Sequence, residues 1–109
     1  MELPATLHSQ AIADRPVLAD CLTLWLSNLM MNDCEIAPAT RQLVDVLAGL
    51  AGPVVLVSNE VGGGIVPENA LARRFRDEAG QLNQAVAAAA DRVYLVVAGL
   101  PRILKDSKV

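Results

Sequence analysis

The stretch from residue 54 to residue 69, VVLVSNEVGGGIVPEN, constrains the fold more than any other part of the chain. Four apolar residues give way abruptly to Ser58, Asn59 and Glu60, and three glycines follow before Pro67 opens a helix. The pattern predicts a buried strand that runs into a polar, glycine-rich loop. In an open α/β sheet, ligands bind in the crevice beyond the carboxyl ends of the strands. We therefore expect the functional site at this edge of the sheet.

The composition of the 109 residues argues against several classes of protein. A nucleic-acid interface needs a basic face or stacking side chains, whereas this chain has a net charge of −3 and one residue each of Trp, Tyr and Phe. No segment reaches the roughly 18 uninterrupted apolar residues of a membrane span, and the first ten residues lack the features of a secretory signal. Two cysteines are too few for a disulfide scaffold. We expect a single soluble, cytoplasmic domain.

Apolar spacing places the other elements along the chain. Helices are expected at residues 3–13, 22–30, 38–49 and 67–90, and strands at residues 16–20, 53–58 and 92–98. Because helices connect the first two strands, these strands should pair in parallel. We expect an α/β fold with about three parallel strands and flanking helices. Gly99, Leu100 and Pro101 should end the regular structure and leave a short mobile tail at residues 102–109.

The long helix presents separate faces when its residues are projected at 100° intervals. The apolar residues expected in the core are Leu71, Phe75, Ala79, Leu82, Val86 and Ala89. A second, mostly polar row consists of Asn69, Arg73, Arg76, Gly80 and Asn83. Glycine inside a helix costs about 1 kcal/mol relative to alanine, so we expect a close contact at this row. The row either faces a ligand or forms a polar rim at a helix or subunit contact.

Asp20 ends the apolar strand VLAD, as an acid ends a Walker B strand and holds Mg²⁺ beside nucleotide phosphates. The alternative is that Asp20 only caps the loop. The P-loop that accompanies a Walker B strand, GxxxxGK followed by Ser or Thr, is missing from the sequence. Residues 62–64 could form an anion-binding nest of glycine amides or an ordinary mobile loop. His8, the only histidine, stands at no catalytic or metal-ligand spacing.

Three segments carry a more specific signature: DCLTLWLSNLM at 20–30, VLVSNEVGGGIVPENALARRFRDEAGQLNQ at 55–84 and AADRVYLVVAGLP at 89–101. Together they resemble the bifunctional adenosylcobinamide kinase/adenosylcobinamide-phosphate guanylyltransferase family of cobalamin biosynthesis. The resemblance implies a P-loop NTPase-like fold and an oligomer. It also implies two reactions, namely phosphorylation of adenosylcobinamide by ATP or GTP, and transfer of GMP from GTP to the resulting phosphate through a histidine.

The resemblance also implies site residues. Asp20 matches the acid at the end of the Walker B strand, which binds the nucleotide and Mg²⁺. The positions that match the family's signature run, without individual roles, are Asn59, Glu60, Arg73, Arg76, Asn83 and Gln84.

The chain departs from the family at several points. The family's P-loop and nucleophilic histidine precede the part that this sequence matches, and neither His8 nor Glu2 takes over an upstream role. Gly63 stands where members often carry Met. We expect residues 1–109 to form the C-terminal part of one P-loop-type domain, with no catalytic residue and no turnover alone. The alternatives are a non-catalytic subunit-contact module and a truncated remnant of the enzyme.

Overall fold

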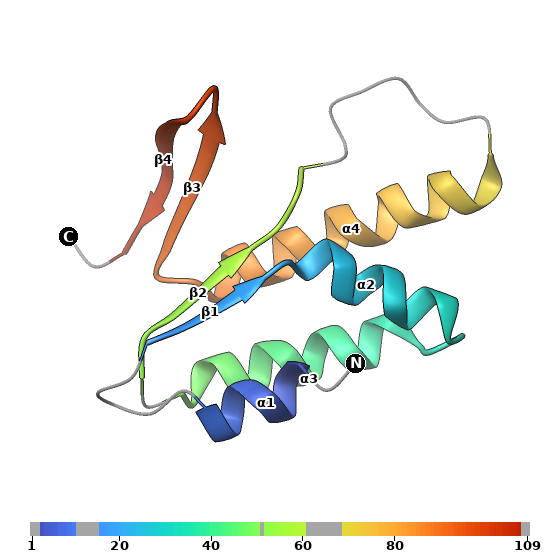
Figure 1. Ribbon diagram of the computed structural model, residues 1–109, viewed down its shortest axis with the longest axis horizontal. Coiled ribbons are helices and arrows are strands. Elements are labelled where there is room, and N and C mark those ends of the chain that lie inside the picture. Colours follow the sequence, from blue (N-terminus) through green and yellow to red (C-terminus); the bar gives the residue numbers. More distant parts are fainter. Residues whose placement is uncertain (1–2, 11–15, 51, 61–68, 108–109) are drawn as a thin grey trace.

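The computed structural model describes residues 3–10, 16–50, 52–60 and 69–107. These residues form an α/β arrangement, as the sequence predicts (Figure 1). In chain order the elements are α1 (Leu3–Gln10), β1 (Val17–Asp20), α2 (Leu22–Met31), α3 (Ile36–Ala48), β2 (Val54–Val57), α4 (Ala70–Ala89), β3 (Arg92–Val97) and β4 (Leu100–Asp106).

The strands β1 and β2 pair in parallel, which confirms the prediction for the first two strands. Val17 lies opposite Val54 and Asp20 lies opposite Val57. A parallel pair needs a crossover connection, and α2 and α3 supply it here. Because the two strands end in register, Asp20 and the residues after Val57 leave the sheet at the same edge.

Among the described residues, only one face of the pair β1–β2 packs against the core, so the expectation of a buried strand is wrong. Exposure alternates with a period of two along both strands, as in a half-buried sheet. The residues that pack against the helical core are Val17, Ala19, Val54 and Leu56. The residues on the other face are Leu18, Val55 and Val57, which are 67%, 59% and 37% exposed.

The hydrophobic core lies among the four helices, with Leu26 of α2 and Leu43 of α3 at 0% exposure. Its other buried members are Leu7, Leu22, Trp25, Leu29, Ile36, Ala79, Leu82 and Val86. The apolar stripe predicted on α4 is thus confirmed in the middle of the helix and wrong near its ends. Leu71 is 66% exposed and Ala89 is also exposed, whereas Ala79, Leu82 and Val86 are buried.

The strands β3 and β4 form an antiparallel hairpin, which corrects two expectations. Neither β1 nor β2 pairs with β3 among the described residues, so the third parallel strand is not observed. Regular structure also does not end at residues 99–101, because Leu100–Asp106 returns along β3, and this strand includes the first five residues of the tail expected from Arg102 onward. Ala98 and Gly99, with φ of 52° and 75°, make a two-residue turn of the kind that requires positive φ at both positions.

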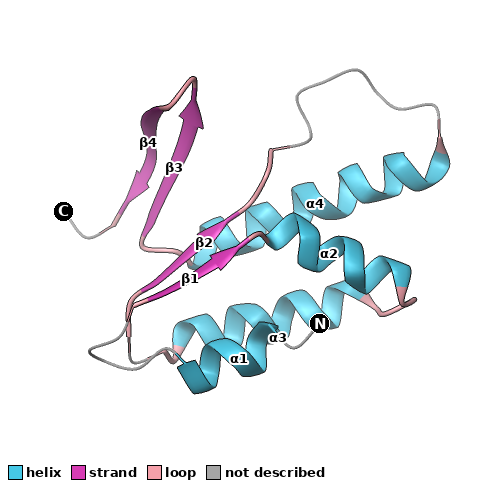
Figure 2. Cartoon of the chain, viewed as in Figure 1, coloured by secondary structure: helices cyan, strands magenta, loops and turns pink. Residues whose placement is uncertain are grey.

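The hairpin stands apart from the helices, as Figure 2 shows. Lys105 of β4 connects it to the end of α4. Lys105 Nζ donates hydrogen bonds of 3.0 Å to the Ala87 carbonyl and 2.9 Å to the Ala88 carbonyl. The last carbonyls of a helix have no partner within the helix, so a cation there satisfies them and interacts favourably with the helix dipole.

Candidate functional site

Side-chain hydrogen bonds join the end of β2 to the middle of α4. Ser58 Oγ donates a 2.6 Å bond to Asn83 Oδ1, and Asn83 Nδ2 donates a 3.3 Å bond to the backbone carbonyl of Asn59. These bonds connect residues 25 and 24 positions apart in the sequence. The structure therefore brings together Asn59 and Asn83, two of the residues that the sequence predicts for the site.

A second connection comes from the start of α2. Asn59 Nδ2 donates a 3.1 Å hydrogen bond to Thr23 Oγ1, which also lies 3.3 Å from Cys21 Sγ. Thr23 is 5% exposed, and these contacts satisfy its buried hydroxyl. Sequence reasoning missed Thr23. The available signal was a threonine in the first turn of a helix that directly follows an acid-terminated strand.

Asp20 is exposed and is the last residue of β1. It precedes Cys21, so it lies next to the hydrogen-bonded group formed by Cys21, Thr23, Ser58, Asn59 and Asn83, which we call the strand-end network. Glu60, also exposed, follows Asn59 directly. The carboxyl ends of β1 and β2 thus carry two carboxylates beside an ordered group of polar side chains.

The two predicted arginines lie nearer the N-terminus of α4 than Asn83 does. At 1.5 Å per residue, Arg76 and Arg73 stand about 10 Å and about 15 Å from Asn83 along the helix axis. Arg76 Nε lies 4.0 Å from Asp77 Oδ1. Asn69, which begins the row, caps α4 by accepting hydrogen bonds from the amides of Leu71 at 2.8 Å and Ala72 at 3.2 Å. Arg73 and Arg76 are thus separated along α4 from Asn83, the member of the strand-end network on that helix.

The remaining predictions about this region concern Gly80, the glycines at 62–64 and Gln84. A Cβ added at Gly80 would meet no heavy atom within 4 Å among the described residues, so the close contact expected at Gly80 is absent there. The glycines at 62–64 lie outside the described residues. Gln84 is exposed on α4, one residue beyond Asn83.

The oxygen donors at the strand ends fit one mode of Mg²⁺ binding. Among the described residues, no three His, Cys, Asp or Glu side chains are grouped closely enough to hold a metal ion by themselves. Mg²⁺ in nucleotide sites commonly takes one or two carboxylates and completes its shell with water and phosphate oxygens. The exposed carboxylate of Asp20 suits that role, and the carboxamide of Asn59 is an oxygen donor at the same edge.

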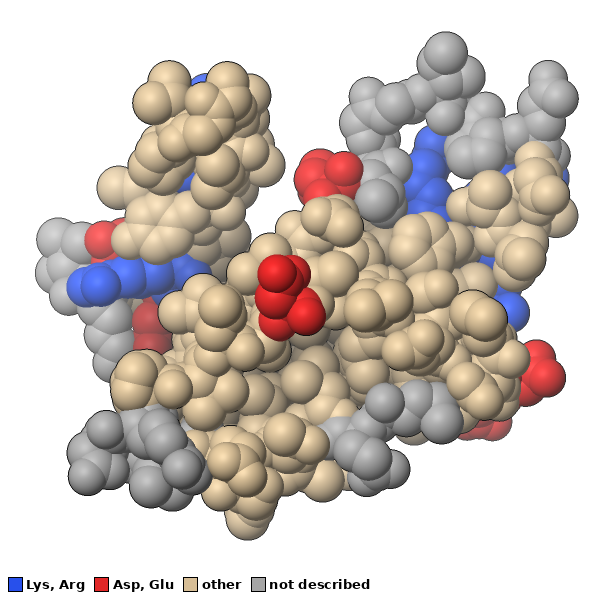
Figure 3. All heavy atoms as spheres, viewed as in Figure 1, with Lys and Arg blue, Asp and Glu red and all other residues tan. Residues whose placement is uncertain are grey.

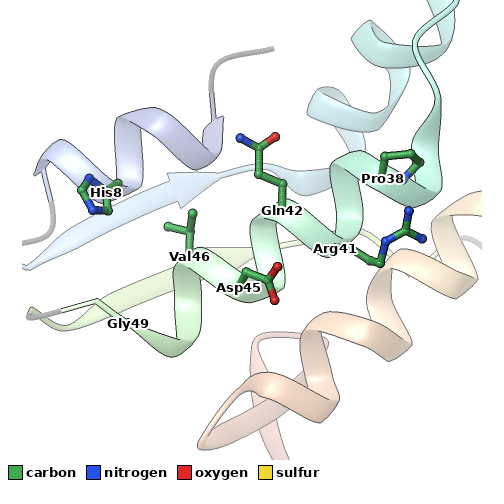
Figure 4. Close-up of a pocket in the computed structure, with 7 residues that line it drawn as sticks. All are labelled: His8, Pro38, Arg41, Gln42, Asp45, Val46 and Gly49. Carbon is green, nitrogen blue, oxygen red and sulfur yellow. The ribbon is translucent and has the colours of Figure 1, made fainter.

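Two surface hollows differ in their relation to this edge. The first, about 600 Å³, lies between α1 and α3, and Figure 4 shows His8 on α1 with the α3 side chains. The other lining residues are Pro38, Arg41, Gln42, Asp45, Val46 and Gly49. The second, about 470 Å³, runs beside β1 and includes Asp20 and Cys21 in its lining. Only the second hollow reaches the strand ends.

The face shown in Figure 3 is mostly uncharged, and the few basic and acidic side chains of the described residues are scattered over it without a continuous basic area. This distribution differs from the continuous basic face of a typical nucleic-acid-binding protein. In the described part of the chain, no helix is both long enough and apolar enough to span a bilayer.

Comparison with known proteins gives consistent matches. A family model described as cobinamide kinase / cobinamide phosphate guanyltransferase matches residues 1–104. The bifunctional adenosylcobalamin biosynthesis protein CobP of Pseudomonas aeruginosa is 50% identical over 107 residues, which cover 96% of this chain and 62% of that protein. Proteins named CobU from Salmonella typhimurium and Escherichia coli are 46% and 37% identical, each over 90% of this chain and 62% of the relative. The chain therefore spans about 62% of the length of these curated relatives.

Proposed function

This chain belongs to the cobinamide kinase / cobinamide phosphate guanyltransferase family, and we propose that it binds a magnesium–nucleoside triphosphate at the ends of β1 and β2. The nucleotide is GTP or ATP, and the reactions served are phosphorylation of adenosylcobinamide and GMP transfer to the resulting phosphate. We further propose that the chain acts in cobalamin biosynthesis, in the cytoplasm and as part of a homo-oligomer. Relatives named for adenosylcobalamin biosynthesis support the proposal.

The observation that carries the proposal is the position of Asp20 beside the strand-end network. An ionised carboxylate at the tip of a parallel strand can hold Mg²⁺ or its water shell, as in phosphoryl-transfer enzymes. When bound, Mg²⁺ neutralises charge on the phosphates. Asp20 would position the ion, and Asn59 would contribute a polar group fixed by Thr23 and Asn83.

The remaining signature residues have supporting roles in this proposal. Guanidinium groups recognise phosphate oxygens through paired hydrogen bonds, so we assign Arg73 and Arg76 to phosphate contacts. The two arginines lie about 10–15 Å from Asn83 along α4. A single phosphate group is too small to bridge that distance, but a nucleotide together with its acceptor substrate can extend across it. Glu60 and Gln84 flank the network and complete the proposed polar surface.

Calorimetry with purified chain tests the nucleotide site. We expect saturable binding of Mg·GTP or Mg·ATP, and we expect Asp20→Ala to weaken it at least about tenfold, the effect of losing one charge-assisted contact. Asp45→Ala is the matched control, because Asp45 is an exposed aspartate in the hollow between α1 and α3. Equal affinity of the wild type and Asp20→Ala, or no binding by a folded wild type, would contradict the proposal. Turnover of adenosylcobinamide is measured in parallel, and none is expected of this chain alone.

A further inference from the structure

Asn59 is held from two sides by residues of different helices. From α4, Asn83 Nδ2 donates a 3.3 Å hydrogen bond to the backbone carbonyl of Asn59. From α2, Thr23 Oγ1 accepts a 3.1 Å hydrogen bond from the side-chain nitrogen of Asn59. Both the backbone and the side chain of this one residue are therefore fixed, although Asn59 is exposed.

The contact with Thr23 distinguishes the two ends of the Asn59 carboxamide. The nitrogen end can only donate hydrogen bonds, and the oxygen end can only accept them. Thr23 takes the nitrogen end, and Thr23 itself is 5% exposed with its hydroxyl also in contact with the thiol of Cys21. The oxygen end of Asn59 is on the opposite branch of the planar group, away from Thr23.

We propose that Thr23 is a positioning residue that orients the Asn59 carboxamide so that its oxygen, and not its nitrogen, meets the bound ligand. This inference rests on the proposed nucleotide site at the strand ends. Asn59 then selects a hydrogen-bond donor of the magnesium–nucleotide, either a magnesium-bound water or an N–H or hydroxyl group of the nucleoside. Bare phosphate oxygens, which accept hydrogen bonds, are not partners for this group.

The position of Asp20 is consistent with this selection. Asp20 leaves the sheet at the same edge as Asn59, and an ionised carboxylate is also purely an acceptor. The oxygen of Asn59 and the carboxylate of Asp20 are two hydrogen-bond acceptors at one edge of the sheet. Such a pair favours hydrogen-bond donors of the ligand and a hydrated cation over an anion. The edge would thus recognise the cation and nucleoside part of the ligand, while phosphate oxygens are left to cationic side chains.

The first test compares Thr23→Val, which removes the hydroxyl while keeping the shape, with Thr23→Ser, which keeps the hydroxyl. In the NMR spectrum of the ¹⁵N-labelled chain, we expect Thr23→Val to speed hydrogen exchange of the Asn59 side-chain amide about tenfold, the effect of losing one hydrogen bond. Thr23→Ser should restore the wild-type rate. Thr40→Val, the same change at a half-buried position of α3, is the control and should leave the rate unchanged.

The second test uses the ligand. We expect Thr23→Val to weaken Mg·GTP binding about tenfold and Thr23→Ser to leave it nearly unchanged. Repeating the titration without Mg²⁺ tests the magnesium-bound water as the donor, and 2′-deoxy-GTP tests the 2′-hydroxyl, because the effect of Thr23→Val disappears when the donor that Asn59 meets is removed. An effect that persists in both titrations assigns the donor to a base N–H or the 3′-hydroxyl. A merely structural role for Thr23 would lower stability without this dependence on the donor.

Asn59→Asp gives an independent readout should Thr23→Val fail to fold. Aspartate offers only acceptor oxygens, so Asp at this position should keep or strengthen Mg·GTP binding, with the Thr23 hydroxyl donating to it. Loss of binding by tenfold or more in Asn59→Asp would overturn the inference, since it would mean that the nitrogen end meets the ligand. An Asn59 amide whose exchange is insensitive to Thr23→Val would overturn it as well. If the folded wild type binds no nucleotide, the proposed function fails, and the exchange rates alone decide whether Thr23 orients Asn59.

Discussion

The hydroxyl of Ser58 donates a 2.6 Å hydrogen bond to the side-chain oxygen of Asn83, and this bond fixes the end of β2 against α4. Asn83 is also a donor to the Asn59 carbonyl, so one side chain stabilises two consecutive residues after the strand. The strand-end network is therefore part of the fold as well as the candidate site.

Replacing Asn83 by alanine should destabilise the chain. The change leaves the part-buried Ser58 hydroxyl and the Asn59 carbonyl without their partner, which we expect to cost about 1–3 kcal/mol in the free energy of unfolding. Urea denaturation measures this difference. Gln81→Ala, at an exposed position of the same helix, should change stability by less than about 0.5 kcal/mol. Equal stability of the two variants would mean that the network contributes nothing.

Lys105→Met should loosen the hairpin from α4. The substitution keeps an unbranched side chain but removes both hydrogen bonds to the carbonyls of Ala87 and Ala88, at an expected cost of about 1–2 kcal/mol. Hydrogen exchange along β4 and urea denaturation report the change. Arg102→Met, on the exposed part of the same strand, is the control. Matching effects of the two substitutions would argue against a specific role for Lys105.

Ala98→Asn should stabilise the hairpin. Ala98 has φ of 52°, a left-handed conformation that asparagine adopts more readily than alanine, so we expect a gain of about 1 kcal/mol. Gly99→Ala should have the opposite effect, because Gly99 has φ of 75°. The midpoints of thermal unfolding of the two variants test these expectations. A lower midpoint for Ala98→Asn than for the wild type would show that the positive φ of Ala98 does not destabilise the hairpin.

Leu43→Ala and Leu18→Ala should separate the core from the uncovered face of the sheet. Leu43 is 0% exposed, so its truncation should cost about 2–5 kcal/mol through lost burial and a residual cavity. Leu18 is 67% exposed, and its truncation should cost less than about 1 kcal/mol. Denaturation midpoints compare them directly. A cost at Leu18 as large as that at Leu43 would mean that the outer face of β1 is covered in solution.

The sequence predicts local elements well because their signals are local. Apolar runs that end in Asp20 and in Ser58 identify the two parallel strands, and helical spacing identifies the middle of α4. The same spacing places Asn83 on the polar row of α4. These predictions depend on the side chains themselves and on nearest neighbours.

Other features depend on contacts that no local pattern contains. The return of the chain at Gly99 is one case, since glycine both ends regular structure and makes hairpin turns, and only the pairing of β3 with β4 decides between them. Thr23 is another, because its role arises from Asn59, 36 residues away. The exposure of Leu71 could not be read from helical periodicity, which gives the direction of a side chain but not the extent of its neighbours.

The exposed outer face of β1–β2 affects which fluorescence signal can follow the thermal unfolding of this chain, with or without a ligand. Dyes that fluoresce on apolar surface will bind the native state through Leu18, Val55 and Val57, so a dye-based melting curve should start from a high baseline. Trp25 offers an internal reporter instead. It is the only tryptophan, it is 6% exposed, and its indole nitrogen has no hydrogen-bond partner among the described residues. Its fluorescence emission should therefore change when the core unfolds, and it should not depend on the apolar surface that binds the dye.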